Sequence, residues 1–138
     1  MAHFVLEYSS NLDGEALALQ PLFAKLHTSA AESGVFPLKG IRSRAYRCEE
    51  YRLADGNAHH AFVHLQVLMG AGRDEETRQH VAKAFFAILQ QHLSPLFAER
   101  GLALSFELKE LEPVLKFNKN NIQDYLNTQD STNIQGSL

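Results

Sequence analysis

One pattern of strand, helix and strand occurs twice along this chain of 138 residues, and it constrains the fold more than any other feature. In the first copy, residues 3–8 alternate in the way a half-buried β-strand does. A helix is predicted to start near Pro21 and to end at Gly34, because proline is tolerated in a first turn and glycine accepts the left-handed conformation that ends a helix. Residues 40–47 then return to strand character.

The second copy begins with a strand over residues 61–69, in which every other side chain is apolar. Asp74 can cap the helix that follows. The predicted apolar face of this helix consists of Val81, Phe85, Ile88, His92 and Leu96. We expect Pro95 to interrupt the helix and Gly101 to end it, before a final strand over residues 102–108.

The two copies are joined through Asp55-Gly56, a dipeptide that supplies the positive φ angles of a tight hairpin. Because residues 46–53 are strand-like, we predict a hairpin between them and the strand over 61–69. The whole order predicts an α+β fold, in which two β-α-β units form a four-stranded sheet with two helices on one face. The same order suits a ferredoxin-like fold, and the strand order distinguishes the two.

The chain length suits one hydrophobic core, so we expect a single domain over residues 1–126. Residues 127–138 are polar and are predicted to form a flexible tail. The sheet has an open face that needs a partner, and residues 112–126 are apolar without a clean period. These residues are therefore candidates to wrap a neighbouring subunit.

The composition excludes several classes of protein. With 45% hydrophobic and 21% charged residues, the chain is typical of globular domains rather than disordered ones. A single cysteine, Cys48, excludes a disulfide scaffold and fits a reducing compartment. The first 20 residues lack a signal-peptide pattern, and no apolar run approaches the roughly 18 residues of a membrane span. We therefore expect a cytoplasmic location and no membrane partner.

The charge is unevenly distributed. The net charge of −3 argues against nucleic acid as a partner, because phosphate binding requires a basic excess. Residues 39–52 nevertheless carry five cations against two carboxylates, which makes this stretch +3 and the remainder −6. A small anionic partner is therefore the better prediction.

Three arginines are the candidate anion-binding residues. Arg42 and Arg44 lie two apart on a predicted strand and share one face, where paired guanidinium groups can hold carboxylates. Arg73 follows a glycine turn, Gly70-Ala71-Gly72, which leaves backbone N–H groups uncovered at a helix N-terminus. Glu75 stands where a dinucleotide-binding motif needs its third glycine, so that motif fails. Taken singly, each arginine is better explained by solvation or by pairing with a neighbouring carboxylate than by anion binding.

Other reactive residue types form no convincing site. His60 and His64 share a strand face, but third and fourth metal ligands are not evident, so we expect no metal site. Cys48 has no nearby histidine in the sequence, and Ser9-Ser10 lack the glycines of a nucleophile elbow. We expect these residues to be structural.

Particular sequence strings resemble those of one known family, the 5-carboxymethyl-2-hydroxymuconate isomerases of the tautomerase superfamily. Each string is weak alone, but their combination in this order is specific and covers most of residues 2 to 125. The strings are His3-Phe4, Leu22-Phe23-Ala24-Lys25, Phe36-Pro37-Leu38, Gly40-Ile41-Arg42-Ser43-Arg44, Ala54-Asp55-Gly56, Ala61-Phe62-Val63-His64, Gly70-Ala71-Gly72-Arg73, Leu102-Ala103-Leu104-Ser105-Phe106-Glu107 and Phe117-Asn118.

The resemblance implies a tautomerase-like fold, a homotrimer, and a cofactor-free isomerase in the bacterial breakdown of homoprotocatechuate. Such an enzyme moves a proton between the 2-hydroxydienoate and 2-oxoenoate forms of a tricarboxylate. The family's base is an amino-terminal proline exposed by removal of the initiator methionine. The resemblance assigns Arg42 and Arg73 to polarising the 2-oxo or 2-hydroxy group and to anchoring carboxylates, with Arg44 beside them.

Position 2 departs from the family, because Ala2 stands in place of the catalytic proline. If Met1 is removed, Ala2 offers a primary α-amine as the base, and we expect weakened catalysis. If Met1 stays, the nitrogen of residue 2 is an amide and cannot act as a base. The alternative from another class is a non-enzymatic oligomeric module that only binds carboxylates through its arginines.

Overall fold

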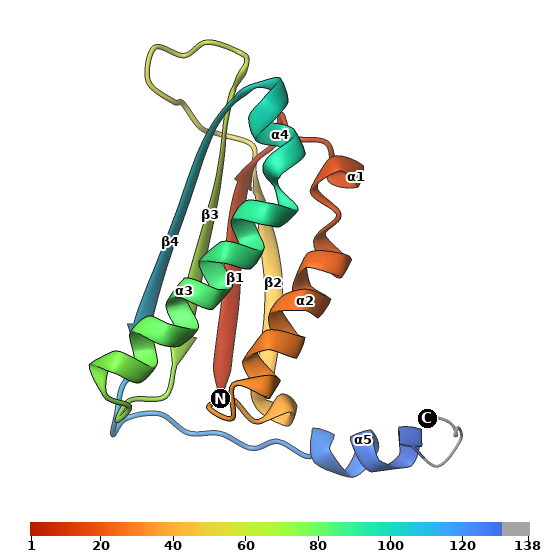
Figure 1. Ribbon diagram of the computed structural model, residues 1–138, viewed down its shortest axis with the longest axis vertical. Coiled ribbons are helices and arrows are strands. Elements are labelled where there is room, and N and C mark those ends of the chain that lie inside the picture. The colour runs from red at the N-terminus through yellow and green to blue at the C-terminus, as the bar shows by residue number, and fades with distance from the viewer. Residues whose placement is uncertain (131–138) are drawn as a thin grey trace.

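The computed structural model describes residues 1–130, with side-chain surroundings through residue 126, and contains a four-stranded mixed sheet with helices on one face (Figure 1). The strands are β1 Ala2–Ser9, β2 Ile41–Cys48, β3 His60–Met69 and β4 Gly101–Glu110. The helices are α1 Gly14–Leu17, α2 Leu19–Glu32, the 3₁₀ helix η1 Leu38–Gly40, α3 Glu75–His92, α4 Ser94–Glu99 and α5 Ile122–Asp130. The predicted α+β class is confirmed.

The strand order is β2-β1-β3-β4, with β1 parallel to β2, β3 parallel to β4, and β1 antiparallel to β3. The two strands of each β-α-β unit therefore pair directly, and the two units meet through β1 and β3. This confirms the predicted repeat. The ferredoxin-like alternative is wrong, since its split β-α-β units place another strand between the two parallel strands.

The predicted hairpin is wrong, because β1 lies between β2 and β3 and both strands hydrogen-bond to it. Strand β2 ends at Cys48, and residues 49–59 cross the end of the sheet as a loop. The predicted turn is only partly right: Gly56 has a φ of +83° and its N–H bonds the Leu53 carbonyl at 2.8 Å, but the other positive φ of this loop, 48°, lies at Ala54 and not at Asp55. That turn serves a crossing loop instead of a two-stranded hairpin.

The core lies between the sheet and helices α2 and α3. Strand β3 buries alternate residues from Ala61 to Met69, as predicted. The predicted stripe on α3 is partly wrong, because Leu89 is fully buried while Ile88 and His92 are half-buried. The buried positions follow a spacing of four residues along this helix, so the apolar face turns slightly away from the predicted one.

The helix ends agree closely with their sequence signals. The Asp74 side chain accepts a hydrogen bond from the Thr77 N–H at 2.8 Å and caps α3, and the break between α3 and α4 falls at the predicted proline. Helix α2 starts two residues before Pro21, because a short helix α1 precedes it and Ala18 joins the two in the left-handed conformation at φ 45°. Gly101 begins β4 rather than ending a helix, since α4 stops at Glu99.

The chain leaves the sheet after β4 as an extended segment, residues 111–121, and ends in α5 (Figure 1). This segment is tied to the sheet by the Leu111 N–H on the Met69 carbonyl at 2.6 Å, and to η1 by the Asn120 side chain on the Lys39 carbonyl at 2.8 Å. Helix α5 continues past the boundary expected at residue 126, and residues 131–138 of the expected tail lie outside the described residues. In the described part of the chain, no helix is long and apolar enough to cross a membrane.

Candidate functional site

The amino terminus starts a central strand of the sheet. Ala2 lies opposite Ile41 of β2 and Met69 of β3, and its side chain is fully buried. The backbone of Met1 lies against Gly40, where an added Cβ would come within 3.1 Å of the Met1 Cα. The α-amine is therefore held at one end of the sheet by backbone packing, which is a geometry that a catalytic amine requires.

The surroundings of the α-amine make it a better base at neutral pH. Burial is the largest cause that lowers the pKa of the Met1 amine below its ordinary value of 8.0, and the charges of Lys116 and Arg42 lower it further. Both effects disfavour the ammonium form, so the amine releases its proton more readily. An amine in this state can accept a proton from a substrate.

Arg42 and Arg44 share one face of β2, as their spacing predicted. It is the face that the helices leave open, since Ser43 between them contacts His27 of α2 at 2.7 Å. Each guanidinium approaches a different nitrogen of His3: Arg42 Nη1 lies 3.1 Å from Nε2, and Arg44 Nη1 lies 3.1 Å from Nδ1. The three side chains are half-buried. Burial, followed by Arg42, Arg44 and the α-amine, lowers the pKa of His3, so the ring is held in its neutral form.

The sequence reasoning missed His3 as a member of this site. The alternation of residues 3–8 could have identified it, because residue 3 is the first residue of the predicted strand to face away from the core and lies immediately beside the amino terminus. The parallel register that places His3 opposite Arg42 could not be derived from the sequence alone.

Arg73 follows β3 and begins the turn into α3. Because β1 and β3 are antiparallel, the end of β3 and the start of β1 lie at the same end of the sheet, which brings Arg73 to the end that holds the amine. Arg73 is exposed and donates to the Val35 carbonyl at 3.5 Å, and among the described residues it forms no ion pair. One N–H of the preceding turn is occupied, since Gly72 N–H bonds the Glu110 carboxylate at 3.2 Å.

The other candidate residues have structural partners. His60 binds the Asp55 carboxylate at 2.9 Å, and His64 contacts the Ser105 hydroxyl at 2.6 Å and the Glu107 carboxylate at 3.3 Å. Within residues 1–126, no group of three His, Cys, Asp or Glu side chains could hold a metal ion.

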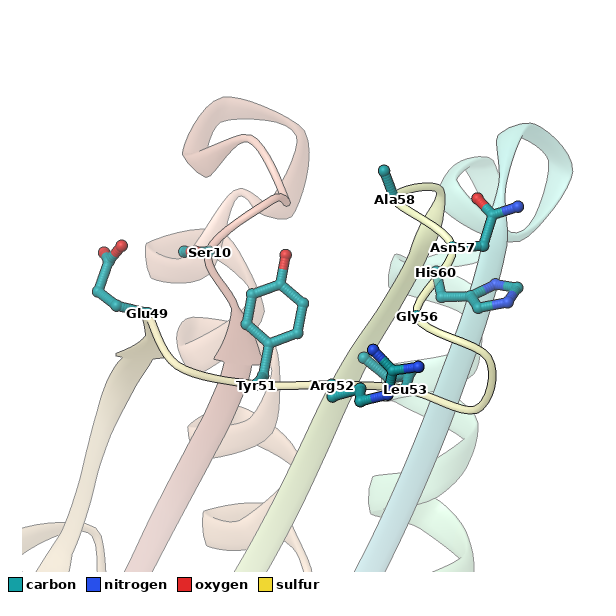
Figure 2. Close-up of a pocket in the computed structure, with 9 residues that line it drawn as sticks. All are labelled: Ser10, Glu49, Tyr51, Arg52, Leu53, Gly56, Asn57, Ala58 and His60. Atoms are coloured by element: carbon teal, nitrogen blue, oxygen red, sulfur yellow. The ribbon is translucent and has the colours of Figure 1, made fainter.

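A cavity of about 350 Å³ lies at the opposite end of the sheet, beneath the loop of residues 49–59 (Figure 2). Its principal charged groups are already used within the loop: Arg52 donates to the Asp55 carbonyl at 3.2 Å, and His60 binds the Asp55 carboxylate. The cavity is therefore separate from the amine and the three arginines.

A paired β-α-β fold that presents an amino-terminal amine beside arginines is the architecture of a tautomerase. The family model described as 5-carboxymethyl-2-hydroxymuconate isomerase matches residues 2–126. The chain belongs to this family.

Individual relatives agree with this family assignment. The 5-carboxymethyl-2-hydroxymuconate Delta-isomerase of Escherichia coli is 43% identical over 122 residues, which are 88% of this chain and 96% of the relative. The crystal structure of a 5-carboxymethyl-2-hydroxymuconate isomerase from Deinococcus radiodurans R1 is 41% identical with a TM-score of 0.82, and the match covers 91% of this chain and 93% of that one. A fused 4-OT symmetric trimer shares the fold alone, at 12% identity and a TM-score of 0.65 over 85% of this chain and 93% of that one.

Proposed function

We propose that this chain is an isomerase that moves a proton between the 2-hydroxydienoate and 2-oxoenoate forms of 5-carboxymethyl-2-hydroxymuconate or a similar polycarboxylate. Membership of the family and a relative of that name at 43% identity support the proposal. The structural observation that carries it is the α-amine, which lies at the start of a central strand and has a lowered pKa caused by burial, Lys116 and Arg42. The substrate class belongs to the degradation of aromatic compounds.

In the proposed reaction, the α-amine accepts the proton of the 2-hydroxyl group, and the resulting ammonium delivers a proton to a carbon of the diene. The double bonds shift, the oxygen becomes a ketone, and no electrons are gained or lost. Negative charge develops on the oxygen during this transfer, and in this proposal the Arg42 guanidinium stabilises it. Arg73 holds a carboxylate as a charge-assisted hydrogen-bond donor, and Arg44 supports substrate binding from beside Arg42.

Ala2 defines the form of the base in this chain. With Met1 removed, the base is the amine of Ala2, a residue that lies opposite Ile41 and Met69 in the sheet. This amine is primary, whereas the family's proline supplies a secondary amine, so its basicity and shape differ. Turnover by the Ala2 amine is therefore expected to be slower than turnover by a proline at the same position.

We propose a homotrimer as the active form. The apolar side chains of residues 114–125 support association with further copies, since Phe117 is 91% exposed and Val114 and Leu115 are 74% and 75% exposed. Sedimentation velocity measures the mass directly. A monomer at micromolar concentration contradicts the trimer.

The experiment that tests the function combines intact mass with an ultraviolet assay of 2-hydroxymuconate ketonisation. Mass spectrometry establishes whether Met1 is present, and the assay compares this chain with Ala2→Pro. We expect the Met1-free Ala2→Pro variant to be the faster of the two, by about 10² to 10⁴ if the full benefit of general acid–base catalysis is recovered. If the Met1-free proline variant turns over no 2-hydroxydienoate, the isomerase proposal is wrong.

The second candidate, a non-enzymatic carboxylate-binding module, rests on the same arginines and on Ala2 at the catalytic position. It predicts dicarboxylate binding that weakens in Arg42→Ala and Arg73→Ala, with no turnover even from the proline variant. The same assay separates the two.

A further inference from the structure

His3 lies between two groups that can only donate hydrogen bonds. Its Nε2 is 3.1 Å from Arg42 Nη1, and its Nδ1 is 3.1 Å from Arg44 Nη1. A neutral imidazole has one acceptor nitrogen and one N–H, and a guanidinium has no acceptor. Only one of the two contacts can therefore be a hydrogen bond, and at the other contact two N–H donors lie side by side.

Protonation of the ring does not resolve this conflict. An imidazolium would place an N–H at both contacts and add a third positive charge to the cluster. The charged groups that face His3 are Arg42 and Arg44 from β2 and the α-amine at the start of β1, and all of them, after burial, lower its pKa. Its register partner on β3, Leu68, is uncharged. The ring is accordingly neutral.

Two adjacent donors on an open face are complementary to one carboxylate. We propose that His3 is a further substrate-binding residue: Nδ1 accepts from Arg44, and the Nε2 N–H together with Arg42 donates to a single carboxylate of the substrate. The donor pair lies on the Arg42 side, because Arg42 directly follows Ile41, the register partner of Ala2, whereas Arg44 lies two residues further from the amino terminus. A carboxylate there lies beside the reacting part of the molecule. This inference rests on the proposed function for the identity of the substrate.

The same arrangement gives Arg44 a defined task. Arg44 donates to His3 Nδ1, which fixes the tautomer with its proton on Nε2. Arg44 thereby acts through His3, as a positioning residue, while Arg42 and His3 contact the ligand. The parallel pairing of β1 with β2 sets this geometry, since His3 lies opposite Arg42 and Val5 lies opposite Arg44.

The first test reads the tautomer of His3 directly. Imidazole ¹⁵N shifts are recorded with and without tricarballylate, an unreactive tricarboxylate, and His3 is assigned by comparison with His3→Gln. We expect Nε2 to carry the proton and its shift to move on addition of tricarballylate. A His3 ring with its proton on Nδ1, or one that does not respond to tricarballylate, overturns the inference.

The second test measures binding and turnover in matched variants. His3→Leu removes both the donor and the acceptor, His3→Gln retains one of each, and His59→Gln on the exposed loop serves as the control. For His3→Leu we expect about tenfold weaker tricarballylate binding, because a lost hydrogen bond to a charged group weakens binding by about that factor. KM should rise by a similar factor, and kcat should change less than threefold. Partial recovery in His3→Gln supports a hydrogen-bonding role over a packing role.

The outcomes separate this inference from the proposed function. If tricarballylate binding depends on His3 but no variant turns over a 2-hydroxydienoate, the binding role stands and the isomerase proposal is wrong. If turnover is normal and His3→Leu leaves both KM and tricarballylate binding unchanged, the isomerase proposal stands and the role of His3 is wrong.

Discussion

The two β-α-β units share a backbone plan but differ in the chemistry of their open faces. In the first unit, His3 of β1 lies opposite Arg42 of β2, and its neighbours are cations. In the second unit, His64 of β3 lies opposite Ser105 of β4 and contacts the carboxylate of Glu107. Each central strand therefore carries a histidine whose charged neighbours have opposite sign in the two units.

The reason only one unit carries the proposed site is the start of the chain. The α-amine of Met1 lies directly before β1, whereas β3 begins at His60 after the loop of residues 49–59, so the backbone nitrogens at its start are amides. An amide is not a base at neutral pH. The two units share the scaffold, and the first unit places the α-amine beside Arg42.

The largest expected difference between the units concerns Arg42. Arg42→Ala should lower kcat/KM about 10³-fold, because removal of one donor to a developing oxyanion costs about 10² to 10³ and a charged donor lies at the upper end. Ser105→Ala, at the corresponding position of the second unit, should change kcat/KM less than threefold. The ultraviolet ketonisation assay on the Ala2→Pro background measures both. Equal losses in the two variants would contradict a site confined to the first unit.

The two units should respond equally where they share a core. Leu6 and Leu65 are register partners on β1 and β3, and both are fully buried. Each Leu→Ala substitution should lower the free energy of unfolding by about 3 kcal/mol through lost burial and a cavity. Urea unfolding at one fixed protein concentration tests this. A difference of more than about 2 kcal/mol between the two variants would show that the halves are not equivalent in the core.

Substitution of Arg73 tests whether the second unit contributes to substrate binding at the proposed site of the first unit. Arg73→Ala should raise KM about 30-fold, because a charge-assisted hydrogen bond to a carboxylate contributes about 1.5 to 3 kcal/mol. Lys83→Ala on α3 removes an exposed positive charge from the same unit and is the control. If both variants raise KM equally, Arg73 acts through general charge and not by direct contact.

The helices of the two units begin differently. Helix α3 has a side-chain cap from Asp74, while α2 begins at Ala18, which has no side-chain cap and a φ of 45°. Asp74→Ala should therefore cost about 1 kcal/mol of stability, and Ala18→Gly should gain up to about 1 kcal/mol by relieving the left-handed alanine. Thermal unfolding resolves shifts of this size. If Ala18→Gly instead destabilises the protein, the greater conformational entropy of glycine in the unfolded chain outweighs the relief of strain at the left-handed alanine.

The smallest expected effect is on pH dependence. Lys116 lowers the pKa of the α-amine, and the base acts when deprotonated, so activity rises as pH increases through this pKa. Lys116→Gln should raise the pKa and move the acid limb of kcat/KM to higher pH, while Lys119→Gln should leave it in place. An acid limb that does not move in Lys116→Gln would exclude Lys116 from the surroundings of the amine.

The sequence by itself determined the repeated units, the core face of β3, the cap at Asp74 and the break before α4, because periodicity and capping are local properties of the chain. It also carried the resemblance that assigned Arg42 and Arg73. The sequence did not determine the strand order. Strand β1 lies between β2 and β3, so these two strands are joined by a crossing loop and not by the expected hairpin. Strand order depends on contacts between residues far apart in the sequence. The tertiary structure alone placed His3 between Arg42 and Arg44, since only the parallel register of β1 with β2 brings these residues together.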